Sequence, residues 1–408
     1  MIFRNRPLAR FGAAALLASG VFTALGTPAY AAGTETDLSL DVAGTRIAAG
    51  ASGKVAFVKV TNNGKNTPGS LAIKADLSKV DINKVVPVPV DEGPDGCDYE
   101  EDGETLKSWV CNVPAGALPG PGETLELPIV VFKAGESLEG TYQAPVSFTL
   151  ISKDDTDDSN NTKDTVVELT DESGADLTVF APDVKQAVKV DQDGLISVVG
   201  DLHAGETGQL VYVVANQGDQ AVAGLKITVK LPKGTTFTEA EPGCEYNAAN
   251  TEAVCTYGEF PLIPVEQDGE ENDKLVSVAE FYHLLSVGKD VKAGALSGGS
   301  VTVDPILPRT ELRASARELR KLPENAKALS TDDIDASDNT DGYAVIVAAK
   351  GGTGGGDGDG GSLPVTGPQA GLIGGIGGAV LIAGGVMFLM ARRRRVVLVT
   401  PGDEKPTA

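Results

Sequence analysis

The chain of 408 residues contains a long internal repeat, and this repeat constrains its fold more than any other feature. Residues 60–64 (VTNNG) and 69–77 (GSLAIKADL) match residues 214–218 (VANQG) and 223–231 (AGLKITVKL) at a constant offset of 154 residues. A repeat of this length indicates a duplicated domain, because the units of solenoid proteins are only about 20 to 50 residues long. The sequence therefore predicts two related domains.

Further matching segments mark the ends of each copy. Residues 37–40 (DLSL) open the first copy as residues 176–179 (DLTV) open the second. The segments SNNT at 159–162 and SDNT at 337–340 precede the apolar residues that close the two copies. The repeat therefore runs from the start to the end of each domain.

The apolar residues of each copy alternate with polar ones or form short solid runs, which is typical of β-strands. The clearest examples are residues 55–60, 125–132, 146–151 and 210–214. Gly, Pro, Asn and Asp separate the runs, and Asn62-Asn63-Gly64 and Asn216-Gln217-Gly218 are expected to turn the chain between strands. We therefore expect an all-β sandwich in each copy rather than a βαβ fold.

Each copy runs from an opening strand through the turn at 62–64 or 216–218 to a closing Asn-rich segment. This set of features resembles the immunoglobulin-like, cell-adhesion-related domains of bacterial surface proteins, and the resemblance covers both copies. It implies two tandem Ig-like β-sandwiches, which we place at residues 32–170 and 171–350.

The N-terminus has the parts of a secretory signal peptide. Arg4, Arg6 and Arg10 precede an apolar stretch, and Ala29-Tyr30-Ala31 supplies the small residues of a signal peptidase site. We expect signal peptidase to remove residues 1–31. Because no paired arginines occur there, the general secretory route is expected rather than the twin-arginine route.

The C-terminus combines a short motif, an apolar segment and a basic cluster. The motif consists of Leu363, Pro364, Val365, Thr366 and Gly367. Residues 371–391 carry no charge, and 21 residues in a helix cover roughly the 30 Å of a bilayer core. The four arginines at 392–395 place the end of this predicted transmembrane helix in the cytoplasm, so the motif lies outside the membrane.

This order of motif, span and basic cluster resembles the LPxTG cell-wall sorting signal of Gram-positive surface proteins, which are substrates of sortase. The resemblance implies that sortase cleaves the Thr366–Gly367 bond and joins Thr366 covalently to an amine of the peptidoglycan. The alternative is an ordinary membrane anchor with an accidental LPVTG motif. The tail at residues 396–408 keeps this alternative open, because sorting signals usually stop soon after the basic cluster.

Four cysteines, two in each repeat of an exported chain, predict two local disulfides. The expected pairs are Cys97–Cys111 and Cys244–Cys255, each around a plausible turn at 102–103 or 249–250. Each disulfide would link the two strands of a hairpin. In the chain-entropy model, closing a loop of this size adds about 3 kcal/mol to the free energy of unfolding. Zinc is the alternative, but the chain has no C-x-x-C and no suitably placed histidines.

The mature part is strongly acidic. Removal of both ends takes eight basic and two acidic residues from totals of 34 and 57, leaving 26 basic and 55 acidic residues and a net charge of −29. This charge argues against nucleic acid or anionic lipid as a partner. The densest basic patch is Arg309, Arg313, Arg317, Arg320 and Lys321. It lies on, and directly before, a predicted helix at 310–322, after a predicted acidic loop at 266–273. The patch is either a solvated face or a contact for an anionic wall polymer.

The search for catalytic residues finds little, and we expect no enzyme. His203 and His283 are the only histidines, and the HExxH, P-loop and G-x-S-x-G motifs are absent. The glycines at 356, 358 and 361 fit a dinucleotide fingerprint, but they lie in a Gly-rich linker at 351–362 with no helix after it.

Calcium is the one metal that the sequence suggests. Two acidic segments at 154–158 and 332–335 place carboxylates close together beside the closing strand of each domain. The candidate ligands are Asp155, Asp157, Asp333 and Asp335. Neither segment is an EF-hand, and solvated Asx-rich turns are the alternative, so no cofactor is assigned.

The expected role is that of an exported protein held in the cell wall. The twelve-residue linker spans about 20 Å on average, so the two domains stay within or near the wall. Adhesion or envelope scaffolding is the expected function, with sortase, peptidoglycan and signal peptidase as partners and an extracellular protein or wall polymer as a possible ligand. The competing class is a wall-tethered binding protein or enzyme with a ligand site in the second domain.

Overall fold

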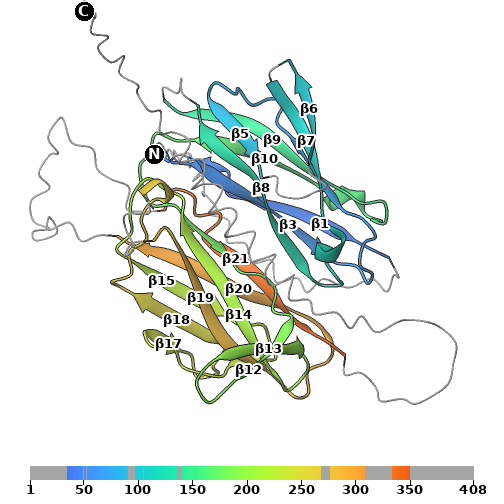
Figure 1. Cartoon of the computed structure of the whole chain (residues 1–408), viewed down its shortest axis with the longest axis vertical. Helices are drawn as coiled ribbons and strands as arrows, with labels where there is room; N and C mark the ends of the chain where they lie inside the picture. Colours follow the sequence, from blue (N-terminus) through green and yellow to red (C-terminus); the bar gives the residue numbers. More distant parts are fainter. Residues whose placement is uncertain are drawn as a thin grey trace, which may run out of the picture. The chain divides into compact units, whose positions relative to one another are not determined.

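The computed structural model has β-strands as its main elements (Figure 1). It describes residues 35–48, 50–51, 53–90, 97–103, 105–135, 140–267, 276–307 and 333–349. Within these ranges the helices are three short 3-10 turns, η1 (Ala115–Ala117), η2 (Asp158–Asn160) and η3 (Val265–Gln267), and none is long and apolar enough to cross a membrane.

Several of the predicted segments lie outside the described residues. These are the signal peptide at 1–31, most of the acidic loop at 266–273, the helix at 310–322, the linker at 351–362 and the sorting signal at 363–408. All of them stay predictions.

The first sandwich contains two sheets packed around one core (Figure 1). One sheet has the order β1 (Leu38–Ala43), β3 (Lys54–Asn62), β8 (Thr124–Ala134), β5 (Val85–Pro89). The other has the order β2 (Arg46–Ile47), β10 (Thr162–Leu169), β9 (Tyr142–Ile151), β4 (Ala72–Asp76), β7 (Thr105–Asn112), β6 (Cys97–Asp102). Trp109, Phe132 and Phe148 are fully buried between them.

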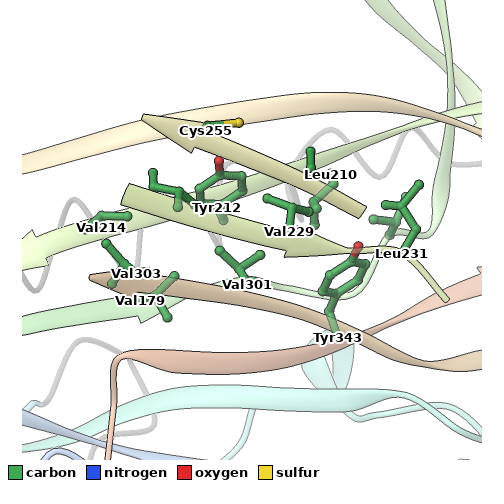
Figure 2. Packing of buried hydrophobic residues seen from close by; sticks show 14 of the residues in the cluster. Val179, Leu210, Tyr212, Val214, Val229, Leu231, Cys255, Val301, Val303 and Tyr343 are labelled. Atoms are coloured by element: carbon green, nitrogen blue, oxygen red, sulfur yellow. The ribbon is translucent and has the colours of Figure 1, made fainter. Parts of the chain in front are cut away.

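The second sandwich is built in the same way. One sheet has the order β13 (Ile196–Asp201), β12 (Gln186–Val190), β14 (Thr207–Asn216), β19 (Val278–Val287), β16 (Thr235–Phe237), and β11 (Leu177–Phe180) also pairs with β14. The other has the order β17 (Cys244–Tyr246), β18 (Glu252–Tyr257), β15 (Gly224–Lys230), β20 (Gly294–Ile306), β21 (Thr340–Val347). Figure 2 shows Tyr212, Val229 and Val303 together in its core.

The strand orders of the two sandwiches correspond to each other. The path β1-β3-β8-β5 of the first sandwich recurs as β11-β14-β19-β16, and β10-β9-β4-β7-β6 recurs as β21-β20-β15-β18-β17. The hairpin of β12 and β13 is an addition to the second sandwich that the sequence pattern did not reveal. Its edge strand β13 and the adjacent turn expose apolar side chains, with Leu195 at 67% exposure.

The predicted turns at 62–64 and 216–218 share one hydrogen-bond pattern. The buried Asn216 side chain donates to the carbonyl oxygens of Gln220 and Leu262 and accepts from the N–H of Gly218. Asn62 makes the corresponding bonds in the first copy. A Cβ at Gly218 would lie 2.3 Å from the carbonyl oxygen of Gly174, so only glycine fits this approach.

Both predicted disulfides form. Cys97 and Cys111 are directly opposite in the β6–β7 hairpin, as Cys244 and Cys255 are in the β17–β18 hairpin. The turns contain Gly103 with φ of 67° and Asn250 with φ of 52°, left-handed values that Gly and Asn tolerate best. The local sequence therefore specifies both hairpins.

Candidate functional site

The most unusual feature of the described residues is a buried lysine, Lys54, at the start of β3. Its Nζ lies 2.6 Å from Asp176 Oδ1, 2.9 Å from Asp338 Oδ2 and 3.4 Å from Asp335 Oδ2. Lys54 belongs to the first sandwich and the three aspartates belong to the second. We call Lys54 and these aspartates, with Asp333 beside them, the Lys54 cluster. A buried charge is costly without an opposite charge next to it, so the cluster stabilises the contact between the two sandwiches.

The turn before β21 positions two of these aspartates. Asp335 Oδ1 accepts hydrogen bonds from the N–H and hydroxyl of Ser337, while Asp338 Oδ2 accepts one from the hydroxyl of Thr178. Asp333 in the same turn accepts a 2.8 Å bond from the N–H of Leu177. The donors of these hydrogen bonds all belong to the second sandwich, so they orient the carboxylates independently of Lys54. Such preorganised carboxylates suit a docking site for a cation.

The Lys54 cluster contains more negative than positive charge. Burial raises the pKa values of Asp176 and Asp338, and it raises that of Asp333 to about 6. Burial alone would lower the pKa of Lys54, but the carboxylates of Asp176, Asp338 and Asp335 outweigh it and hold that pKa above its ordinary value. Asp176 Oδ2 and Asp338 Oδ1 have no hydrogen-bond partner among the described residues. We therefore expect the cluster to retain a proton on a carboxyl group at neutral pH.

A second charged group joins the sandwiches farther along β3. Lys59 lies directly opposite Glu126 of β8, with Nζ 2.7 Å from Glu126 Oε1, and it also donates to Oδ1 of Asp341 on β21. Asp341 Oδ2 accepts a 2.6 Å hydrogen bond from the N–H of Ala181. Burial, followed by the charge of Asp341, raises the pKa of Glu126 well above its ordinary value. We therefore expect Glu126 to hold a proton within this group of Lys59, Glu126 and Asp341, the Lys59 triad.

Neutral contacts continue the same interface. The N–H of Val55 donates to Gln217 Oε1 at 2.8 Å, and Val55 packs with Val131 and Val265 in a small apolar cluster that contains residues of both sandwiches. The rings of Phe57 and Phe180 have centroids 6.1 Å apart. Apolar side chains of β3 thus also take part in the contact between the sandwiches.

Two polar contacts lie at the edge of the interface. Asp183 of the second sandwich accepts 2.7 Å hydrogen bonds from the N–H groups of Thr124 and Ala344, and burial raises its pKa to about 6. Lys185 forms a 2.6 Å ion pair with Glu123 of the first sandwich. The two sandwiches are therefore joined by several separate polar contacts and not by the Lys54 cluster alone.

The calcium candidates take part in protein hydrogen bonds. Asp333 and Asp335 belong to the turn at the Lys54 cluster, while Asp155 accepts from the N–H of Leu38 at 3.4 Å and Asp157 caps η2. Over the described ranges, no group of three or more His, Cys, Asp or Glu side chains is arranged to hold a metal ion. Calcium binding stays a prediction.

The two histidines occupy separate structural settings. His203 Nδ1 lies 3.0 Å from the carbonyl oxygen of Ala348. His283 is buried, hydrogen-bonded to the Tyr212 hydroxyl at 3.2 Å and in ring contact with Phe237, and burial lowers its pKa to about 4. His283 therefore acts as a neutral core residue.

The sequence did not predict a charged interface, although two of its acidic residues, Asp333 and Asp335, were singled out as calcium candidates. The alignment of the repeats does contain a signal, because Lys54 and Lys59 interrupt a strand whose second copy has Gly208 and Val213 at those positions. A lysine in only one copy of a duplicated strand indicates a role specific to that copy.

Comparisons with known proteins add little to this account. No family model and no curated protein matches the chain. Similar solved structures include the Streptococcus agalactiae AgI/II polypeptide BspA C-terminal domain, with TM-score 0.21 and 10% identity over 66% of this chain and 95% of that chain. A biofilm associated protein B domain gives TM-score 0.22 and 8% identity over 67% and 83% of the two chains. The Fcho1 Mu homology domain of Danio rerio with bound Eps15 peptide gives TM-score 0.22 and 8% identity over 66% and 82%. Such low scores carry no argument, so function must be inferred from the chain's own residues.

Proposed function

We propose that the chain is a surface protein anchored to peptidoglycan through Thr366, which displays two Ig-like domains for adhesion or envelope scaffolding. The sandwich orders support the Ig-like assignment, since β1-β3-β8-β5 and β10-β9-β4 correspond to the ABED and GFC sheets of a constant-type domain. The motif at 363–367, followed by an apolar segment and four arginines, supports the anchor.

The observation that carries a display role is the buried charge at the contact between the two domains. Domains on a flexible linker move independently, whereas Lys54 and Lys59 each bind acidic groups of the second sandwich in surroundings that exclude water. Displacing the domains would leave these charges buried and unpaired, or would require their rehydration. The pair is therefore suited to act as one stiff unit at the end of a short tether.

Mass spectrometry of muramidase-released wall fragments tests the anchor. A fragment ending at Thr366 and linked to a stem-peptide amine is expected, and the Thr366→Ala variant should yield none. Recovery of a chain that extends through Ala408 in the membrane fraction would overturn the anchoring proposal.

Comparison of cells that carry the wild-type chain with cells that carry Thr366→Ala then separates the two roles. Adhesion predicts that the variant loses cell attachment to surfaces or to other cells. Scaffolding predicts unchanged attachment with altered sensitivity of the wall to muramidase.

A further inference from the structure

The Lys59 triad brings an amine and a carboxyl group into contact in a site that is largely closed to water. The side chains of Glu126 and Asp341 are 8% and 1% exposed, and that of Lys59 is 21% exposed. Lys59 Nζ donates a hydrogen bond to Asp341 Oδ1, so its nitrogen is next to the carboxyl carbon. Glu126 is hydrogen-bonded to both partners. The three groups needed for an acid-assisted condensation are therefore already assembled.

Burial favours the condensed state over the ion pair. An ammonium and a carboxylate lose their hydration when they are buried, and their mutual attraction repays this loss only in part. Condensation replaces both charges with one neutral amide and releases a water molecule. In bulk water, hydration of the two ions opposes this reaction, but that opposition is weakened in a closed site.

We propose that Lys59 and Asp341 form an isopeptide bond that links the two sandwiches covalently, with Glu126 as the proton carrier. Glu126 donates its proton to Oδ1 of Asp341, and the Glu126 carboxylate then takes a proton from the Lys59 ammonium. The Nζ–Cγ bond forms, the Cγ–Oδ1 bond breaks, and Oδ1 leaves as water. The two protons lost by nitrogen balance those of the water, Glu126 is regenerated, and no oxidant or reductant is needed.

The second oxygen of Asp341 has a partner that suits this reaction. Oδ2 accepts the N–H of Ala181 at 2.6 Å, and this donor stabilises the negative charge that develops on Oδ2 when the nitrogen attacks. Oδ2 then stays as the carbonyl oxygen of the amide. The hydrogen bonds of Asp341 thus distinguish the oxygen that leaves from the oxygen that remains.

Lys54 and Lys163 also form close ion pairs with an aspartate, but they lack this combination. Lys54 is shared among three carboxylates, and Oδ2 of its nearest partner, Asp176, has no hydrogen-bond donor among the described residues that could stabilise a developing negative charge. Lys163 is 2.7 Å from Asp41, but their side chains are 45% and 65% exposed, so water stabilises both ions. Both pairs should remain unlinked, which makes them internal controls.

Peptide mapping of the full chain tests the proposal directly. After reduction, denaturation and trypsin digestion, peptide 55–65 should appear joined to peptide 328–350, with a mass equal to their sum less one water. Trypsin should not cut after Lys59 but should cut after Lys54 and Lys163. Separate peptides 55–59 and 60–65, with the intact peptide 328–350, would overturn the proposal.

Variants then test the role of each group. Lys59→Arg retains the positive charge and Asp341→Ala removes the acceptor carbon, so each should abolish the linked peptide. Glu126→Gln retains the side-chain shape and should slow linkage of newly made chain by about a hundredfold. An unchanged linkage rate in Glu126→Gln would overturn the role of Glu126, and linked peptide in Lys59→Arg would overturn the assignment of Lys59. Circular dichroism of each variant checks that it folds.

Discussion

The two copies of one acidic turn have opposite surroundings, although their local bonds are alike. In the first copy Asp155 accepts the N–H of Leu38, and in the second Asp333 accepts the N–H of Leu177 at the same place in the repeat. Asp157 and Asp335 each bind the serine two residues later. The first turn faces solvent, whereas the second is buried at the contact with the first sandwich. The shared bonds therefore serve the fold, and only the second copy uses the turn for docking.

One residue type accounts for much of this difference. Asn160 in the first copy donates a 3.1 Å hydrogen bond to Asp37, which neutralises part of the local charge. The second copy has Asp338 in place of that asparagine, and Asp338 and Asp176 share the ammonium of Lys54 instead. The two copies thus differ in that the first turn has a donor of its own sandwich, whereas the second turn has a cation from the other sandwich.

Only the first sandwich supplies lysines to this contact. The positions of Lys54 and Lys59 are occupied by Gly208 and Val213 in the second sandwich, so it has no lysines to insert into a further acidic turn. The second sandwich therefore cannot repeat this particular contact through the same strand positions.

The largest expected effect comes from removing the buried cation. Lys54→Met leaves Asp176 and Asp338 buried without a positive partner and should lower the free energy of unfolding by about 3 to 5 kcal/mol. The matched change Lys163→Met breaks an exposed pair and should lower it by less than about 1 kcal/mol. Urea unfolding at neutral pH measures both. Equal losses would show that burial of the pair does not matter.

A second difference between the interface and the core of the second sandwich is the sign of their pH dependence. The raised pKa of Asp183, about 6, means that its contribution to stability is complete below pH 4 and is lost as the pH rises through 6. The lowered pKa of His283, about 4, means that its contribution is complete above pH 6.5 and is lost as the pH falls through 4. Each contribution amounts to about 3 kcal/mol at most.

Two variants separate these opposite slopes. The penalty of Asp183→Asn should shrink between pH 4 and pH 7, because the wild-type interface weakens over that range. The penalty of His283→Gln should shrink between pH 7 and pH 4. Thermal unfolding of the three proteins in a pH series is the measurement, and a penalty that is independent of pH would refute the corresponding assignment.

The sequence predicts those parts of the molecule that depend on near neighbours along the chain. The turn at Asn216 and the hairpin of Cys244 and Cys255 each need only a few adjacent residues, so their patterns are visible without a structure. The contact of Lys54 with Asp176 joins residues 122 positions apart, and it depends on how two finished domains meet. A lysine in an alternating strand is expected to face water, so local pattern alone points away from the buried position.

The same limit applies to the acidic turn of the second copy. Its carboxylates suggested either calcium or solvated Asx turns, and those alternatives assumed that any cation or solvent would come from outside the chain. In the structure Asp335 faces the ammonium of Lys54 and accepts the N–H of Arg46. A cation supplied by another domain was not among the alternatives, because nothing near Asp335 in the sequence identifies it.

The smallest expected effect is the coupling between each turn and Lys54. Asp335→Ala removes the contacts with Ser337 and Arg46 and a 3.4 Å approach to Lys54, and should lower the free energy of unfolding by about 2 kcal/mol. Asp157→Ala removes only the bonds to Ser159 in an exposed turn, so its effect should be smaller.

Double-mutant cycles with Lys54→Met separate the docking role from the local one. Asp335 and Lys54 should show a coupling of about 1 kcal/mol, because they share one buried cluster. Asp157 and Lys54 should be additive, since the turn that contains Asp157 faces solvent and makes no contact with the lysine. Coupling of equal size at both aspartates would mean that the two turns still act alike, and that Asp338 rather than the whole turn carries the docking site.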